Sequence, residues 1–166
     1  MELSNQLIVD MGKFVIAHNP DTLCVLGIGS CIAVVLYDLE QHIGGLAHVM
    51  LPDSKSMGRD TTKELNLNKF ADVAIPNMLS EMQKKGCKKE RIKAKIAGGA
   101  HMFKTIVETE ILEIGKRNIE AVKSALDQFS IPLIGEDTGG SCGRTVRFDI
   151  STGVVTVRTI NGIFKI

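Results

Sequence analysis

The feature that most constrains the fold is a series of short apolar, β-branched runs separated by turn residues. They occur at Leu7–Ile16, Thr22–Leu26, Ile32–Tyr37 and Ile43–Leu51. Runs of this length and composition predict β-strands. Only the short polar segment Leu39–His42 separates the last two, which predicts a β-hairpin. The first half of the chain is therefore expected to form mostly sheet.

The second half alternates between strand and helix patterns. Residues Asn68–Lys85 and Asn118–Phe129 repeat apolar side chains at helical spacing and predict two helices. Further short strands are predicted at Ile92–Ala97, Pro132–Gly135, Val146–Ile150 and Val154–Ile160. This order predicts an α/β class, with α+β as the alternative, in a single domain of residues 1–166: one mixed sheet flanked by two main helices. The polar segment Pro52–Leu65 predicts a long surface loop of the kind that often borders a site.

Composition argues against several functional classes. Lysine and arginine total 20 and aspartate and glutamate 19, so the net charge of +1 gives no basis for binding nucleic acid or an anionic membrane. No apolar run approaches the roughly 20 residues of a membrane span, and the start lacks a signal-peptide pattern, so we expect a cytoplasmic protein without membrane insertion. The four cysteines contain no C-x-x-C spacing and predict reduced thiols; we expect no metal and no cofactor.

The segment whose residues could take part in catalysis is Gly27–Cys31, a glycine-rich turn at the end of a predicted strand. His48 lies in the strand predicted to pair with the one after Cys31, and adjacent antiparallel strands can bring two such side chains together on one face. An imidazole can lower the pKa of a neighbouring thiol and accept its proton. Backbone N–H groups around Ser30–Cys31 could hold an oxyanion.

Alternatives exist for each of these residues. On Cys31 and His48 alone, a buried thiol and a core histidine are the favoured reading, because free cysteine commonly acts as a small hydrophobic residue. Cys142 also lies in a glycine-rich loop and is the rival nucleophile, while Cys24 is expected to be buried and Cys87 exposed. The pair Gly98 and Gly99 either lines or supports the substrate cleft or forms a plain turn.

Several blocks together resemble a known family. They are Leu26–Val34, Ile43–Asp53, Ala97–Phe103, Ile114–Asn118, and Glu136–Gly140 with Arg144. In sequence, order and spacing these blocks resemble the CheD family of chemoreceptor glutamine deamidases, and they span nearly the whole chain. The resemblance implies that Cys31 is the nucleophile and His48 the general base and acid. We predict that Gly29, Ser30, Gly98 and Gly99 contact the substrate.

The resemblance also implies a substrate and a partner. The substrate is a glutamine side chain on the cytoplasmic helical region of a chemoreceptor (a methyl-accepting chemotaxis protein), which a protein-glutamine glutaminase converts to glutamate. The partner is CheC, a phosphatase of the response regulator CheY. The alternative function is a CheC-binding regulator with little deamidase activity of its own.

One position departs from the family pattern. The family often has a threonine six residues before the cysteine, which orients the histidine, and here that position is Val25. Thr22, Ser30 or a backbone carbonyl remain as candidate orienting groups.

Overall fold

A computed structural model describes residues 3–55, 66–102 and 113–166, and within these ranges it contains ten strands and two α-helices. Five strands form sheet A, in the spatial order β1 (Gln6–Ile8), β3 (Thr22–Ile28), β8 (Arg144–Asp149), β9 (Val154–Thr159) and β10 (Gly162–Lys165). Five form sheet B, in the order β2 (Phe14–His18), β5 (Ile43–Val49), β4 (Ile32–Asp38), β6 (Lys93–Gly98) and β7 (Leu133–Thr138). The helices are α1 (Ala71–Lys84) and α2 (Ile114–Gln128). Short 3-10 turns at Leu67–Lys69 and Lys89–Arg91 flank α1.

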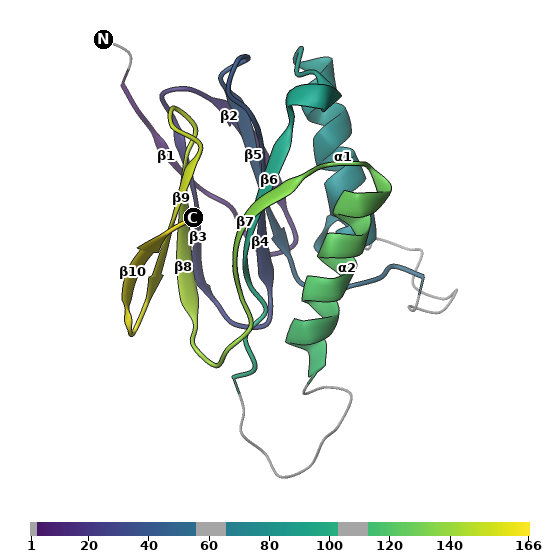
Figure 1. The fold of residues 1–166 in the computed structure, drawn as a ribbon, viewed down its shortest axis with the longest axis vertical. Coiled ribbons are helices and arrows are strands. Elements are labelled where there is room, and N and C mark those ends of the chain that lie inside the picture. Colours follow the sequence, from purple (N-terminus) through teal and green to yellow (C-terminus); the bar gives the residue numbers. More distant parts are fainter. Residues whose placement is uncertain (1–2, 56–65, 103–112) are drawn as a thin grey trace.

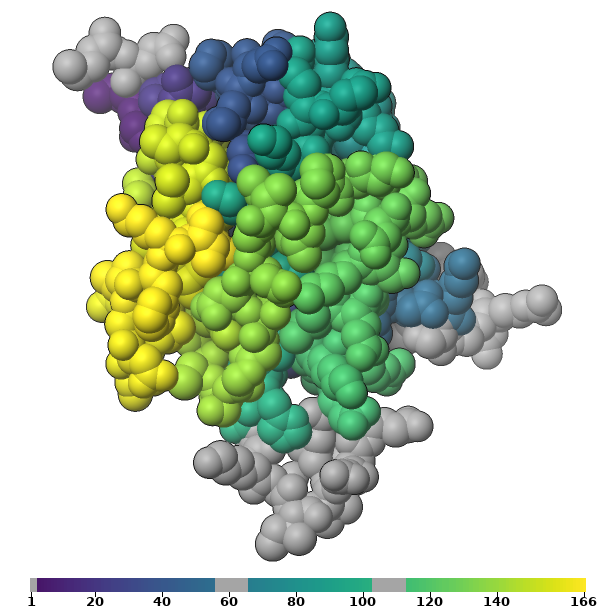
Figure 2. Space-filling model, viewed as in Figure 1, coloured from purple at the N-terminus to yellow at the C-terminus, as the bar shows by residue number. Residues whose placement is uncertain are grey.

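These elements form three layers, with sheet B in the middle (Figure 1). The alternation of side chains along β4 explains why: Ile32, Val34 and Leu36 pack in one buried cluster with both helices. Ala33 and Val35 pack in a second cluster against sheet A. Because successive strand residues face opposite sides, one continuous apolar run fills both cores. The space-filling view shows the β9–β10 hairpin at one edge of the molecule and α2 covering the other side of the same face (Figure 2).

The predicted α/β class is confirmed, and both sheets are mixed. In sheet A, β1 runs parallel to β3, and in sheet B, β6 runs parallel to β7; the other pairs are antiparallel. The predicted hairpin is confirmed as β4–β5, with Ile32 opposite Val49. The strands divide between two sheets instead of forming one, and β10 was not predicted.

The helix predictions were confirmed with shifted ends. Helix α1 begins at Ala71, and Gly86 follows its end with φ +96°, a conformation that favours glycine. Helix α2 begins at Ile114, four residues before the predicted start. The predicted loop Pro52–Leu65 lies outside the described residues from position 56 onward.

The chain crosses from sheet A to sheet B in the three residues Gly29–Cys31, between β3 and β4. A register shift between Val25 and Ile28 interrupts the pairing of β3 with β8, and Gly27 within it has φ +57°. The bulge ends the strand and turns the chain toward the neighbouring sheet. Cys31 is therefore the last residue of a tight crossing between the layers.

No helix in the described ranges is long and apolar enough to cross a membrane.

Candidate active site

The register of the β4–β5 hairpin puts Cys31 and His48 on the same face of sheet B. Ala33 pairs with His48, and Cys31 lies two residues before Ala33, so it occupies the diagonal position on that face. Cys31 packs against the cluster between the sheets, which also contains Ala33 and Leu46. Leu46 and His48 are two residues apart on β5 and face the same side. Both chemical groups therefore project into the layer between the sheets, at the end where β3 crosses into β4.

His48 is a buried histidine whose backbone makes two hydrogen bonds to the loop before β2. Its N–H donates to the Lys13 carbonyl (2.9 Å), and its own carbonyl accepts from the Gly12 N–H (3.0 Å). The side chain is only 5% exposed, and among the described residues neither ring nitrogen has a partner with hydrogen-bond geometry. Burial lowers the pKa of the imidazole, and the nearby Val9 backbone and Asp10 charge oppose this only in part. The ring is therefore neutral at neutral pH and can accept a proton.

Cys31 is partly exposed. Burial raises the pKa of its thiol, and the thiol's proximity to its own backbone N–H acts in the opposite direction. The resting state is therefore a neutral thiol and a neutral imidazole. A base must remove the thiol proton as the sulfur reacts.

Three loops meet around Cys31 at one end of the sandwich, the lower end in Figure 1. The Gly99 N–H donates to the Cys31 carbonyl (2.9 Å) and the Ala100 N–H to the Gly29 carbonyl (2.9 Å). The Gly139 N–H donates in turn to the Gly98 carbonyl (2.9 Å). These bonds join the loop before β4 to those after β6 and β7.

The predicted substrate-contact glycines have steric roles in this arrangement. Gly98 has φ +123°, and a β-carbon there would lie 2.2 Å from the Cys31 carbonyl oxygen. Gly99 has φ +71°, and a β-carbon there would lie 2.5 Å from the Ile119 side chain. A β-carbon on Gly29 would lie 3.0 Å from the Met102 side chain, which covers this turn. Gly98 and Gly99 therefore lie directly against the turn that carries Cys31.

Asn118 is a site residue that sequence reasoning missed. It is fully buried on α2, and its Nδ2 donates to the Ser30 carbonyl (2.9 Å) and to the Met50 carbonyl (3.0 Å). Gly115, one turn earlier, allows the close approach, since a β-carbon there would lie 2.7 Å from the Gly99 carbonyl oxygen. Two signals were available: a polar residue at a core-facing position of α2, next to Ile119 and Val122, and the place of Asn118 at the end of the family block Ile114–Asn118.

Thr22 does not share the layer that Cys31 and His48 face. Leu23 and Val25 point into the core between the sheets, so Thr22 points to the other face of sheet A. It also lies at the start of β3, whereas the crossing to Cys31 follows the end of that strand. Val25 is fully buried in the layer that His48 faces, and it has no hydrogen-bonding group.

The remaining cysteines differ in environment. Cys24 is buried as expected, on the face of β3 opposite Leu23 and Val25. The expectation that Cys87 is exposed was wrong: it is 5% exposed in the core beside α1, and burial raises the pKa of its thiol to about 11. Cys142 is partly exposed, and its sulfur accepts a hydrogen bond from Asn161 Nδ2 (3.5 Å).

A surface pocket of about 270 Å³ lies at the opposite end of β4, lined by residues that include Tyr37, Asp38 and Arg91. Its main charges are already paired, because Arg91 binds Asp38 (2.8 Å) and Glu40 (3.1 Å). The described residues contain no group of three or more histidine, cysteine or acidic side chains that could hold a metal.

Comparison with known proteins gives consistent matches. Residues 50–159 match the family model described as CheD chemotactic sensory transduction. Proteins named "Probable chemoreceptor glutamine deamidase CheD" from Clostridium botulinum (strain Hall) and Clostridium novyi (strain NT) are each 48% identical over 145 residues, covering 87% of both chains. The family match spans the Asn118 region, and the identity to these relatives extends over most of the sequence. The chain therefore belongs to the CheD family.

Proposed function

We propose that this chain is a protein-glutamine glutaminase that hydrolyses the side-chain amide of chemoreceptor glutamines, with Cys31 as nucleophile and His48 as general base and acid. The relatives named as chemoreceptor glutamine deamidases support the substrate class. The observation that supports the catalytic roles of Cys31 and His48 is their diagonal placement on one face of sheet B, with Cys31 just before β4 and His48 in β5. In this role residues 1–166 act as one domain in the cytoplasm.

The reaction proceeds in two steps. His48 takes the thiol proton as the Cys31 sulfur forms a bond to the amide carbon, and the carbonyl π electrons move onto oxygen to give an oxyanion. The tetrahedral intermediate collapses, the carbon–nitrogen bond breaks, and the imidazolium protonates the departing ammonia. A thioester to Cys31 remains. His48 then deprotonates a water molecule, whose oxygen forms a bond to the thioester carbon. The carbon–sulfur bond breaks and the imidazolium returns the proton to sulfur, so the net change is glutamine plus water to glutamate plus ammonia.

The oxyanion needs hydrogen-bond donors at the Cys31 turn. The Cys31 N–H is close enough to its own sulfur to lower the thiol pKa. A donor beside the attacking sulfur is also close to the oxygen of the carbonyl that the sulfur attacks. We assign the Cys31 N–H as the principal oxyanion donor. Ser30 and Gly29 form the turn that the substrate amide contacts.

The test is mass spectrometry of a chemoreceptor cytoplasmic fragment incubated with wild-type, Cys31→Ala and Cys142→Ala protein. We expect conversion of specific glutamines to glutamate by the wild type and by Cys142→Ala, and none by Cys31→Ala. Because Cys142 is the rival thiol, the two variants form a matched pair. Deamidation by Cys31→Ala at the wild-type rate would remove Cys31 from the mechanism.

A second function is favoured by one observation, the absence of a hydrogen-bond partner for His48 within the described residues. A histidine without an orienting group is a poorer base. The chain would then act mainly as a regulator that binds CheC, with little turnover. A Cys31→Ala variant that binds CheC normally and restores chemotaxis in a deletion strain would favour this function over catalysis.

A further inference from the structure

Asn118 is the feature of the molecule that neither the sequence pattern nor the proposed mechanism explains. It is fully buried in α2, yet it carries an amide. Its Nδ2 donates two hydrogen bonds, while its Oδ1 is buried without a partner among the described residues. An unpaired buried acceptor costs free energy, so packing alone gives no reason for an asparagine at this position. The two donated hydrogen bonds are what an apolar side chain of the same size would lose.

Both acceptors lie just outside the ends of β4 and β5, close in sequence to the proposed reacting groups. The last backbone pair of the β4–β5 ladder is Ile32 with Val49, and beyond it the two chains separate. Ser30 immediately precedes Cys31, and Met50 lies two residues after His48. One amide nitrogen therefore ties the two chains together where their own ladder ends.

The direction of the Ser30 hydrogen bond sets the orientation of one peptide unit. Asn118 lies on the helix side of sheet B, so the Ser30 carbonyl points toward the helices. The Ser30–Cys31 peptide is trans, and in a planar trans peptide the carbonyl and the following N–H point in opposite directions. The Cys31 N–H therefore points away from the helices, toward the layer that contains the Cys31 and His48 side chains.

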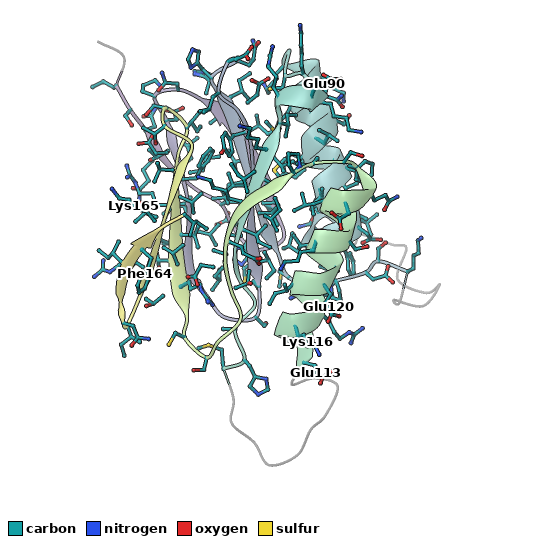
Figure 3. The ribbon with its side chains drawn as sticks, viewed as in Figure 1. Glu90, Glu113, Lys116, Glu120, Phe164 and Lys165 are labelled. Atoms are coloured by element: carbon teal, nitrogen blue, oxygen red, sulfur yellow. The ribbon has the colours of Figure 1, made fainter. Side chains whose placement is uncertain are left out.

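The surroundings of α2 are consistent with this orienting role. Lys116 and Glu120 lie on its exposed side (Figure 3), while Gly115 and Asn118 face inward. Gly115 brings the helix backbone against the Gly99 carbonyl, and Gly99 donates to the Cys31 carbonyl. The peptide units on both sides of Cys31 are thus fixed by contacts that α2 makes or supports.

We propose that Asn118 is a positioning residue that fixes the Ser30–Cys31 peptide plane and so aims the Cys31 N–H at the oxyanion of the tetrahedral intermediate. The inference rests on the proposed deamidase function and adds to it the group that aligns the oxyanion donor. Asn118 itself touches neither the substrate nor the reacting sulfur in this role. Its effect is confined to steps in which negative charge develops on the amide oxygen.

The test compares two reactions of the same thiol. Deamidation forms an oxyanion, whereas alkylation of Cys31 by iodoacetamide displaces iodide without forming one. For Asn118→Leu we expect kcat for deamidation to fall by about 10²-fold, the lower end of the effect of losing one oxyanion donor. We expect KM and the rate of Cys31 alkylation to stay within about 3-fold of wild type, since neither depends strongly on oxyanion stabilisation.

Controls separate positioning from stability. Val122→Ala removes a fully buried side chain one turn further along α2 and leaves both Asn118 hydrogen bonds in place. It is expected to lower Tm and to leave kcat per folded molecule at the wild-type value. Asn118→Ala introduces no larger group and serves as a second variant should Asn118→Leu fail to fold; it is expected to show the same selective loss of kcat.

The outcomes are distinguishable. If the wild type does not deamidate, the proposed function fails. If the wild type deamidates but folded Asn118→Ala retains its kcat, the inference about Asn118 fails while the function stands. Equal losses of deamidation and alkylation would also overturn the inference, because they would show that Asn118 acts on the thiol and not on the oxyanion donor.

Discussion

Replacing Gly98 by alanine tests the idea that glycines hold the Cys31 turn by close backbone contact. The new β-carbon would lie 2.2 Å from the Cys31 carbonyl oxygen, and since real contacts essentially never fall below 3.0 Å, the carbonyl must move by at least 3.0 − 2.2 = 0.8 Å. The φ of +123° adds strain for any residue with a side chain. The movement would break the hydrogen bond from Gly99 to the Cys31 carbonyl.

The backbone strain and the lost hydrogen bond together determine how much Gly98→Ala destabilises the fold. Strain at a positive φ costs about 1–2 kcal/mol, and a lost buried hydrogen bond adds about 1–3 kcal/mol. The free energy of unfolding is therefore expected to fall by about 2–5 kcal/mol, which lowers Tm by about 2–4 °C per kcal/mol for a chain of this size. Because the displaced carbonyl belongs to Cys31 itself, kcat for deamidation should fall in the fraction that remains folded.

Gly139→Ala is the matched control. Gly139 also has a positive φ, +79°, and is hydrogen-bonded to Gly98, but no atom of the described chain lies within 4 Å of its would-be β-carbon. It should lose only the strain, about 1–2 kcal/mol, and keep its kcat. The measurements are thermal unfolding by circular dichroism and deamidation by mass spectrometry. If the two variants lose equal stability and equal activity, the steric reasoning about Gly98 is wrong.

The remaining predictions concern His48, Val25 and Asp38. Since burial lowers the pKa of His48, the acid limb of the kcat/KM profile should lie below the pH of about 6.5 at which an ordinary histidine titrates, and a limb at or above that pH would contradict a buried neutral base. Stability should likewise fall as pH drops from about 6.5 toward the lowered pKa, and scans of His48→Gln should show a smaller fall. Val25→Thr places a hydroxyl in the layer that His48 faces and should raise kcat in a progress-curve assay, whereas an unchanged kcat with a lower Tm would show that the hydroxyl stays unpaired. Burial raises the pKa of Asp38, but its hydrogen bonds from Arg91 and the backbone outweigh this and hold it below its ordinary range; Asp38→Asn should therefore lower Tm at neutral pH, and an unchanged Tm would show that the Arg91 pair adds nothing.

Local sequence patterns were sufficient to predict the hairpin that contains His48 and begins directly after Cys31. The apolar runs of β4 and β5 and the short polar turn between them are adjacent in sequence, so their pairing depends on few residues. The two helices were predicted for the same reason, because the apolar period within each helix is a local property.

The division into two sheets could not be predicted in this way. Alternation shows which face of a strand is buried, but it does not show which other strands share its sheet. Strand β10 was missed because all four of its residues are exposed and its pattern resembles a loop. Cys87 follows a lysine-rich helix end, which suggested exposure, yet the chain turns there and buries it beside α1.

Asn118 was missed for a different physical reason. Its partners are backbone carbonyls, which are the same in every residue, so no pattern of side chains elsewhere in the sequence reveals the contact. Such links between a distant helix and a turn become visible only once the tertiary structure places them together.

The crossing at Gly29–Cys31 has a mechanical consequence. A linker of only three residues between two packed sheets cannot absorb a relative movement of the sheets. Any such movement would therefore displace Cys31. A β-carbon on Gly44 of sheet B would lie 2.4 Å from the ring of Phe148 in sheet A, so this contact helps to set the distance between the two sheets. Substitutions of Phe148, which is remote from Cys31 in the sequence, are therefore expected to shift the sheets and alter the reactivity of the Cys31 thiol through the Gly29–Cys31 linker.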